Sequence, residues 1–410
     1  MKILTDGAVA QLVEQRTENP CVGGSIPSRT TLKSLAIAGL LFYLLYTINY
    51  IFACPSCMNV KENAKTLLPG LNGLRAFSIL LVILDHLDLK YHHSIFRDSV
   101  PLLFDGALGV NTFFVISGFL ITYLLLKEES NYGKISLRSF YIRRSLRIFP
   151  VYYIFLLVCF LLQLAGRAHI DGMSWLTSLT YTKYFSPATD WETTHLWSLS
   201  VEEHFYLLWP FVFKYFKDKR NLFMWAVIIM SPIIRIIYYR HNLPIINSYT
   251  FFWRADAIMW GCCFAIYLDK IKAVVLKYVN SITILIPFAI LVLLFFIDKW
   301  IIQYQWHLGL FTVPLGSTKG TIADICIGVI LIISVYRTSL WSKFLNIPVV
   351  AYMGILSYSI YIWQQLFSCE SLGFLSSFPA NIFFIFLTAY ISYNYIEKPF
   401  LKLRDRYKKV

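Results

Sequence analysis

The chain has 410 residues, of which 57% are hydrophobic, 17% aromatic and only 15% charged, and its formal net charge is +14. Soluble domains carry charged residues at about a quarter of their positions, so this composition excludes an ordinary soluble enzyme. The positive charge does not indicate nucleic-acid binding, because the Lys and Arg residues cluster in short segments between apolar runs, as in membrane proteins.

Residues 1–57 do not follow the pattern of the rest of the chain. Residues 1–33 are polar without periodicity, and 34–53 form a separate apolar run. We predict that the natural start is Met58 and that this N-terminal extension is non-native or poorly ordered; an additional membrane anchor is the alternative. The Cys-Pro-Ser-Cys sequence at 54–57 has a redox or zinc spacing, but one pair without a second is a weak signal, and we expect no metal site.

From Leu71 onward, repeated apolar runs predict an all-α polytopic membrane protein, a bundle of about ten transmembrane helices. This membrane domain covers 58–400, and a basic cytoplasmic tail follows at 401–410. The expected spans lie near 71–89, 107–126, 148–165, 197–216, 222–239, 252–268, 281–298, 320–336, 349–368 and 380–397.

Lys and Arg residues concentrate after the second, fourth, sixth and eighth expected spans and in the tail. With ten spans, all these segments lie on one side, which the positive-inside rule assigns to the cytoplasm. We therefore expect both ends of the ten-span unit in the cytoplasm and the protein in the bacterial inner membrane. The stretch 172–185 is too short and too polar to span, and an interfacial or re-entrant segment is expected there.

The first expected span carries an arginine and a histidine eleven positions apart, Arg75 and His86. Eleven steps make three helical turns plus roughly 20°, so both side chains share one helix face, about 16 Å apart along the axis. Ionisable groups inside membrane helices are costly and usually functional. Imidazole titrates near neutral pH and suits a general base. Alternatively, Arg75 is an anchor at the membrane boundary and His86 a hydrogen-bonded packing residue.

A basic segment at 139–150, expected to be a loop, leads into the third span. Arg144 and Arg147 are neighbours on one face if this segment is helical, so their guanidinium groups can grip one phosphate. Ordinary positive-inside anchoring is the alternative reading.

Three further segments combine polar groups with apolar surroundings. Ser117 stands beside a glycine in a bulky run, which favours close helix packing. Glu202 and Glu203 follow the outer boundary of the fourth expected span. Arg254 and Asp256 open the sixth span, where they pair with each other or with groups on other helices.

Taken in order, these segments resemble the acyltransferase-3 family of integral membrane O-acyltransferases. The resemblance covers residues from about Leu68 to Phe400 and depends on an ordered set of motifs rather than on any single one. The motifs are Gly-Leu-Arg-Ala…His, Phe-Phe-Val-Ile-Ser-Gly-Phe, Arg-Arg-x-x-Arg-Ile-x-Pro, Trp-Ser-Leu-Ser-Val-Glu-Glu-x-Phe-Tyr, Arg-x-Asp-Ala and Ser-Tyr-x-Ile-Tyr.

The resemblance implies transfer of an acyl group, commonly acetyl, from cytoplasmic acyl-CoA to a hydroxyl of a surface carbohydrate such as O-antigen, capsule or exopolysaccharide. It implies that Arg75 and His86 are the family's catalytic arginine and histidine, and that Arg144 and Arg147 are its donor-binding pair. The chain departs from many relatives at Gln364, where they have a histidine. A glutamine hydrogen-bonds but does not exchange a proton near neutral pH.

The expected mechanism places the CoA phosphates on the arginines and makes His86 the general base for a sugar hydroxyl. Arg254 or a buried hydroxyl stabilises the oxyanion, and Glu202, Glu203 or Asp256 orients the imidazole or binds the sugar. We expect a stand-alone enzyme without an appended hydrolase-like domain, with the bilayer and a glycan as partners and acyl-CoA as co-substrate. A transporter or flippase of a glycolipid or metabolite, with its charges lining a pathway, and a membrane scaffold without chemistry are the alternatives.

Overall fold

The computed structural model describes residues 68–91, 105–186, 190–240, 251–279, 283–369 and 372–407, without the side chains of 88–91, 238–240, 251–253 and 298–319. These residues belong to one compact unit. The predicted N-terminal extension lies outside them, so its nature stays a prediction.

Within the described ranges every regular element is helical, which confirms the all-α class. The longer helices are α5 (Leu71–Tyr91), α6 (Gly106–Tyr132), α7 (Leu137–Leu164), α9 (Leu196–Tyr215), α10 (Arg220–Arg240), α11 (Phe251–Ile266), α12 (Leu268–Tyr278), α13 (Leu285–Tyr336), α15 (Pro348–Phe367) and α16 (Ala380–Ser392). The shorter ones are α8 (Gly172–Leu179), η2 (Lys183–Phe185), η3 (Lys217–Lys219), α14 (Leu340–Leu345), η4 (Gly373–Ser376), η5 (Tyr393–Glu397) and α17 (Lys398–Asp405).

Each of the ten expected spans overlaps a helix, and the described helical parts of 281–298 and 320–336 both belong to α13. Three described helices are long and apolar enough to cross a membrane: Gly106–Tyr132, Leu137–Leu164 and Lys217–Ile237. The protein is therefore an integral membrane protein on structural criteria too. The count of ten crossings stays a prediction; α11 and α16, for example, have only 16 and 13 residues. The stretch 172–185 forms α8 and η2, both too short to span.

The segment 139–150, expected as a loop, is helical and forms the first turns of α7. Ser136 caps this helix with its side-chain oxygen, and its own backbone N–H donates to the side-chain carboxylate of Glu128 at 2.8 Å. Gly133 ends the preceding helix in the left-handed conformation that glycine adopts without strain. The basic residues thus belong to the N-terminal part of the same helix as the third expected span. Pro150 lies inside this helix and does not end it.

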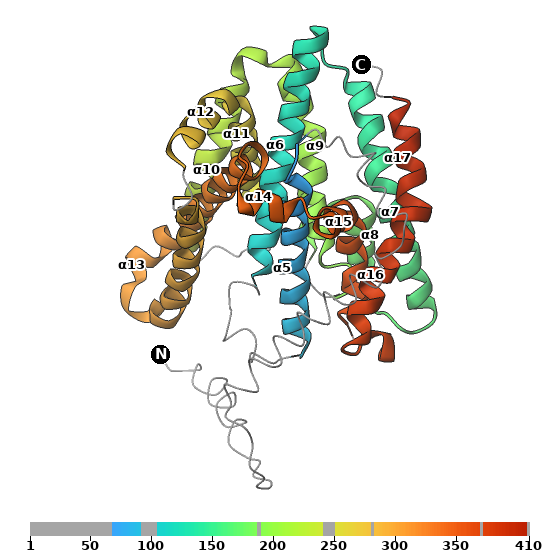
Figure 1. The fold of residues 1–410 in the computed structure, drawn as a ribbon. Coiled ribbons are helices and arrows are strands. Elements are labelled where there is room, and N and C mark those ends of the chain that lie inside the picture. The colour runs from blue at the N-terminus through green and yellow to red at the C-terminus, as the bar shows by residue number, and fades with distance from the viewer. Residues whose placement is uncertain are drawn as a thin grey trace. The chain divides into compact units, whose positions relative to one another are not determined.

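Helix α5 packs against both α6 and α15, and α6 packs along α11 (Figure 1). The α6–α11 contact is close because glycines face it from both helices. A Cβ on Gly118 would stand 1.9 Å from the carbonyl oxygen of Ile258, and one on Gly261 would stand 2.1 Å from that of Val115. The prediction of close helix packing at Ser117-Gly118 is confirmed.

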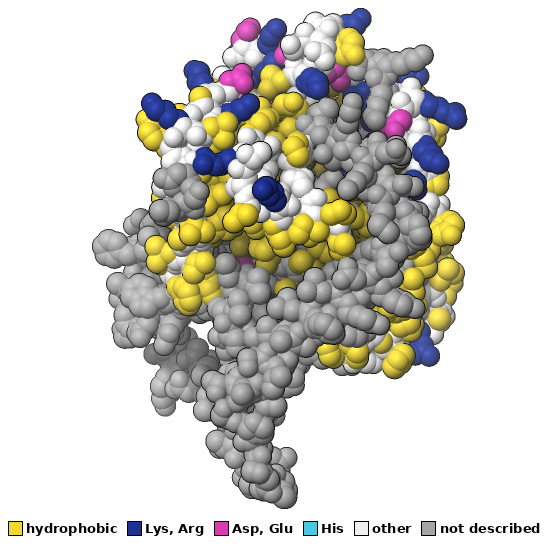
Figure 2. Space-filling model, viewed as in Figure 1, with side chains coloured by type: hydrophobic (Ala, Val, Ile, Leu, Met, Phe, Trp, Pro, Cys, Tyr) yellow, Lys and Arg dark blue, Asp and Glu magenta, His cyan; other side chains and the backbone are white. Residues whose placement is uncertain are grey.

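Lys and Arg side chains gather over the upper end of the face in Figure 2, above a hydrophobic band. Part of this end is fixed by an ion pair between α6 and α10, in which Arg220 donates to both oxygens of Glu129 at 2.7 and 3.0 Å. The helix α17, which begins the basic C-terminal segment, packs beside α7 (Figure 1). The basic ends of α6, α7 and α17 therefore lie at the same end of the bundle.

Candidate active site

A cavity of about 90 Å³, which we call the arginine cavity, opens between α5, α6, α7, α9 and α15. It brings together three of the predicted site residues, Arg75 from α5 and Arg144 and Arg147 from α7. Apolar side chains of α6, among them Phe113 and Phe114, line much of the rest. Arginines from segments about 70 residues apart in the chain therefore share one space, as the sequence predicted.

None of these three guanidinium groups has a hydrogen bond or an ion pair with another described residue. Arg144 lies over the ring of Tyr206, 4.8 Å from its centroid, and at 5.8 Å from that of Phe140. A cation–π contact leaves the N–H donors unused. Glu202 and Glu397 lie within electrostatic range of Arg75 without contacting it. A cavity with three cations and unused donors has the chemistry to bind an anion.

A second cavity of about 390 Å³ continues from the first, since Leu120, Arg144 and Arg147 line both. We call it the basic vestibule; its other charged residues are Lys127, Glu128, Arg143 and Arg404. Glu128 is occupied by Arg143, whose Nη2 is 3.1 Å from Oε2. The vestibule thus leads from the basic end of the bundle to the arginine cavity, and it carries a net positive charge.

Ser117 and Glu202, both predicted site residues, meet in the wall of the arginine cavity. The Ser117 hydroxyl donates to Glu202 Oε1 at 2.8 Å, and the hydroxyl of Tyr206 donates to the other oxygen at 3.0 Å. Tyr206 also contacts the Ser117 oxygen at 3.1 Å. Tyr206 was not among the predicted site residues; its position one helical turn after Glu202 on α9 is the signal in the sequence that points to it.

His86 lies further along α5 and does not line the arginine cavity. Its Nδ1 is 2.8 Å from Gln364 Oε1, and its ring meets Trp191 edge to face at a centroid distance of 6.0 Å. Tyr361, one turn before Gln364 on α15, does line the cavity and bonds to Ser198 at 2.5 Å. The face of α15 next to α5 therefore leads from the cavity to the imidazole.

The partner of the imidazole is Gln364 rather than Glu202, Glu203 or Asp256, which the sequence analysis considered for this role. One oxygen of Glu203 is buried without a recorded partner. Asp256 is 1% exposed and receives both terminal nitrogens of Arg235, at 3.2 and 2.6 Å.

Arg254 pairs with Asn111 of α6, not with Asp256: its Nη1 donates to Oδ1 at 3.0 Å. Both residues line a separate cavity of about 210 Å³ that also touches α13. Arg254 and Asp256 thus have partners on other helices, and the structure brings neither together with His86. We therefore no longer assign the oxyanion role to Arg254.

Glu397 is a residue near the site whose role the sequence did not suggest. It ends the π-helical turn η5, is 2% exposed, and accepts a hydrogen bond from Ser359 at 3.0 Å. Arg147 and Arg75 lie within electrostatic range of its carboxylate. Isolated π-turns inside α-helices occur often at functional sites.

In the described part of the chain, no group of three or more His, Cys, Asp or Glu side chains is arranged to hold a metal ion. The chemistry available is that of arginine donors, one imidazole with a fixed partner, and a Ser–Glu–Tyr hydrogen-bond network. These groups suit anion binding and proton transfer.

Comparison with known proteins adds the family. Residues 68–397 match the family described as "Acyltransferase domain". Among curated proteins, the chain is similar to "O-acetyltransferase OatA" of Staphylococcus aureus strains NCTC 8325 / PS 47, COL and MRSA252, each 30% identical over 379 residues, covering 83% of this chain and 58% of the relative. The chain thus spans less than two thirds of the length of these relatives. No solved structure matches it.

The family match covers the three arginines, the imidazole and the Ser–Glu–Tyr network described above. It extends over most of the chain and over every helix that contributes to the arginine cavity. This chain belongs to the acyltransferase-3 family of membrane acyltransferases.

Proposed function

We propose that this protein is a membrane-bound O-acyltransferase that moves an acyl group, most simply acetyl, from cytoplasmic acyl-CoA to a hydroxyl of a cell-surface carbohydrate. The family match and the O-acetyltransferase names of the relatives support acyl transfer to oxygen. The acceptor class, for example O-antigen, capsule or exopolysaccharide, rests on the family resemblance.

The observation that carries the proposal is the set of three arginines without carboxylate partners in a cavity that continues into the basic vestibule. Leaving a cation unpaired inside a membrane protein costs several kcal/mol unless a ligand compensates. Acyl-CoA offers such a ligand, because it carries phosphates at one end and an apolar, flexible thioester arm at the other. The phosphates bind Arg75, Arg144 and Arg147, and the arm extends along α5 toward His86.

In the transfer step, the acceptor hydroxyl gives its proton to His86 while its oxygen attacks the thioester carbonyl. The new C–O bond forms, the C–S bond breaks, and CoA leaves as a thiolate that receives the proton from the imidazolium. Ser117, Glu202 and Tyr206 shape the cavity wall between the phosphate end and the reacting carbonyl.

The proposal includes ten membrane crossings, both ends of the ten-span unit in the cytoplasm, and a place in the bacterial inner membrane. The basic end of α6, α7 and α17 supports this orientation, because positive residues face the cytoplasm. Acyl-CoA is also a cytoplasmic metabolite, so the donor side and the positive side coincide. The acceptor then arrives at the other side, where His86 lies nearer the end of α5.

The proposal is tested by incubating the purified protein in lipid nanodiscs with radiolabelled acetyl-CoA and a panel of bacterial glycans. We expect the labelled acetyl group to appear in the glycan, with one free CoA released for each acetyl group transferred. His86→Ala should lower the rate by about 10²- to 10⁴-fold, the usual contribution of general base catalysis. Its acetyl-CoA affinity should stay within a few fold of the wild type.

His169→Ala is the matched control, because His169 is exposed on the segment after α7, away from the cavity. It should keep the wild-type rate. Near-normal turnover in His86→Ala would remove the mechanism, and glycan transport without labelling would support a transporter instead.

A further inference from the structure

The amide of Gln364 continues from His86 into a second glutamine. Gln364 Nε2 donates to Gln365 Oε1 at 3.2 Å, and Gln365 Nε2 donates to the carbonyl oxygen of Trp191 at 2.9 Å. Both glutamines are fully buried, at 0% and 2% exposed. Together with the contact to His86, these bonds form one continuous chain of side chains, which we call the glutamine relay.

The direction of every bond in the relay follows from its last member. A carbonyl oxygen only accepts, so Gln365 must turn its NH₂ group toward Trp191. Its oxygen then faces Gln364, which must donate with its own NH₂ group. The oxygen of Gln364 is left to face His86, and an amide oxygen only accepts. Nδ1 of His86 must therefore carry the proton.

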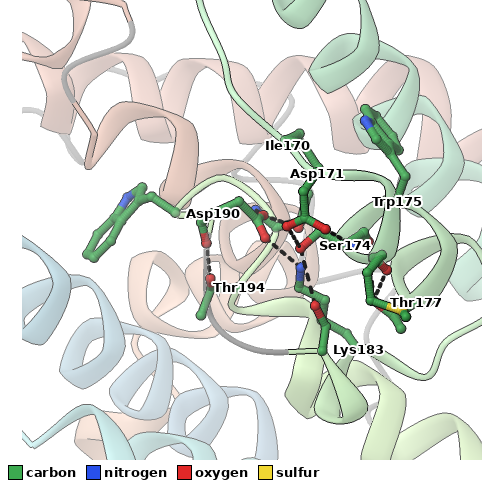
Figure 3. Close-up of polar contacts among 12 residues, drawn as sticks. Ile170, Asp171, Ser174, Trp175, Thr177, Lys183, Asp190 and Thr194 are labelled. Atoms are coloured by element: carbon green, nitrogen blue, oxygen red, sulfur yellow. Dashed lines mark hydrogen bonds and ion pairs between the residues drawn. The ribbon is translucent and has the colours of Figure 1, made fainter.

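The far end of the relay is held in place by a buried ion pair (Figure 3). Lys183 Nζ is 2.7 Å from Asp190 Oδ1, and the two side chains are 2% and 1% exposed. Asp190 also accepts hydrogen bonds from the backbone N–H and the hydroxyl of Thr193, and its carbonyl accepts one from the hydroxyl of Thr194. These bonds fix the backbone on either side of the Trp191 carbonyl.

Trp191 and Gln365 are also joined a second time, because the indole N–H of Trp191 donates to the Gln365 carbonyl at 3.3 Å. The paired bonds hold the segment after Asp190 against the end of α15. The anchor of the relay is thus set by the fold and does not depend on the state of the imidazole.

We infer that Gln364 and Gln365 are positioning residues that keep neutral His86 in the tautomer with its proton on Nδ1 and its lone pair on Nε2. Among the described residues none has a recorded hydrogen bond to Nε2, so its lone pair has no protein donor. Histidine in water prefers the opposite tautomer, with the proton on Nε2, so the relay changes which nitrogen acts as a base. The statement that Nε2 receives a proton from the acceptor hydroxyl rests on the proposed function.

The test uses protein labelled with ¹⁵N-histidine in nanodiscs at a pH where the imidazole is neutral. Nitrogen chemical shifts distinguish a protonated from an unprotonated ring nitrogen, and subtracting the spectrum of His86→Gln identifies the His86 signals. We expect an unprotonated Nε2 in the wild type. Gln364→Met, similar in size but without the amide acceptor, should move the proton to Nε2. Gln364→Glu gives up the bond to Gln365 but still turns an accepting oxygen toward His86, so it should keep the proton on Nδ1.

Ser368→Ala is the matched control, because the Ser368 hydroxyl donates to the backbone carbonyl of Gln364 and not to its amide. It should leave the tautomer unchanged. A protonated Nε2 in the wild type, or an unchanged tautomer in Gln364→Met, would overturn the inference.

Kinetics on the same variants separate this inference from the proposed function. Gln364→Met should lose about 10- to 100-fold in kcat, part of what a general base contributes, with KM for acetyl-CoA unchanged, and Gln364→Glu should recover most of the rate. Loss of rate in Gln364→Met without recovery in Gln364→Glu contradicts a positioning role. If the wild type shows the expected tautomer but transfers no acyl group, the proposed function fails and the tautomer assignment stands.

Discussion

At the scale of single residues, the guanidinium groups of the arginine cavity have unequal surroundings. Arg144 is held over Tyr206, and Arg75 emerges from a helix packed on two sides. Arg147, like Arg144, lines both the cavity and the basic vestibule, but no ring contact is recorded for its guanidinium group among the described residues. It therefore stands where a phosphate would pass from the vestibule to the cavity.

Arg147→Ala should weaken acetyl-CoA binding by about 10- to 100-fold, the equivalent of one or two charge-assisted hydrogen bonds. The effect should appear in KM and in the dissociation constant from calorimetry, with a smaller change in kcat. Arg138→Ala is the matched control, because Arg138 lies on the same helix but is exposed. Equal losses in both variants would indicate a general effect of surface charge and contradict a phosphate site.

The sequence was sufficient for the residues whose place follows from helix geometry and membrane boundaries. Arg75, Arg144 and Arg147 were each expected at the same membrane boundary, and the structure brings them into one cavity. Partners far apart in the chain carried no such signal. Nothing in the sequence around Asp256 indicated Arg235 on another helix, and nothing around Gln365 indicated the carbonyl of Trp191, 174 positions away.

At the scale of elements, the close crossing of α6 and α11 fixes the position of the cavity wall. Ser117, which lines the arginine cavity, is the neighbour of Gly118, which contacts the α11 backbone. Gly118→Val should clash with the backbone of α11 and lower the free energy of unfolding by about 1–3 kcal/mol or more. Thermal unfolding in detergent measures this loss.

Gly172→Ala is the control for this substitution, since a Cβ at Gly172 meets nothing within 4 Å. It should leave the unfolding temperature unchanged. Wild-type stability in Gly118→Val would mean that the two helices separate without cost, which contradicts the close crossing.

The buried Lys183–Asp190 pair gives the segment after η2 its own pH dependence. Burial raises the pKa of Asp190, but hydrogen bonds from Lys183, Ser174 and Thr193 outweigh burial and hold the pKa below its usual value. Because the folded-state pKa is lowered, the stabilisation is complete above the ordinary aspartate pKa of about 3.9 and is lost as the pH falls through the lower folded value.

Asp190→Asn should therefore flatten the dependence of the unfolding temperature on pH below about pH 5, and lower stability near neutral pH by about 3–5 kcal/mol because Lys183 stays buried without its counter-charge. Asp218→Asn, at an exposed position in η3, is the control and should follow the wild-type curve. Parallel curves for Asp190→Asn and the wild type would contradict a stabilising ion pair.

At the scale of the whole molecule, the repeated apolar runs predicted the helices well. A segment that crosses a bilayer must pair its backbone N–H and C=O groups internally, and a helix does so. The ends of the helices were less predictable where a helix includes charged residues beyond its apolar run. The segment 139–150 is basic enough to suggest a loop, yet it is helical because Ser136 caps it and α17 packs beside it. The same feature places Arg144 and Arg147, the proposed donor-binding pair, on a helix rather than in a loop.

The ten-span topology makes an opposite prediction for the two ends of α7. Arg138, near its start, belongs to the basic end and should face the cytoplasm, whereas Arg167, just after its end, should face the other side. A cysteine introduced at position 167 (Arg167→Cys) should react with a membrane-impermeant maleimide in intact spheroplasts. One at position 138 (Arg138→Cys) should react only after the membrane is permeabilised, and Lys270→Cys, after α11, should behave like it. Arg138 and Arg167 are both exposed, so a difference in labelling reports the side of the membrane rather than burial. Labelling of Arg138→Cys in intact spheroplasts would reverse the orientation and separate the basic vestibule from the cytoplasmic donor.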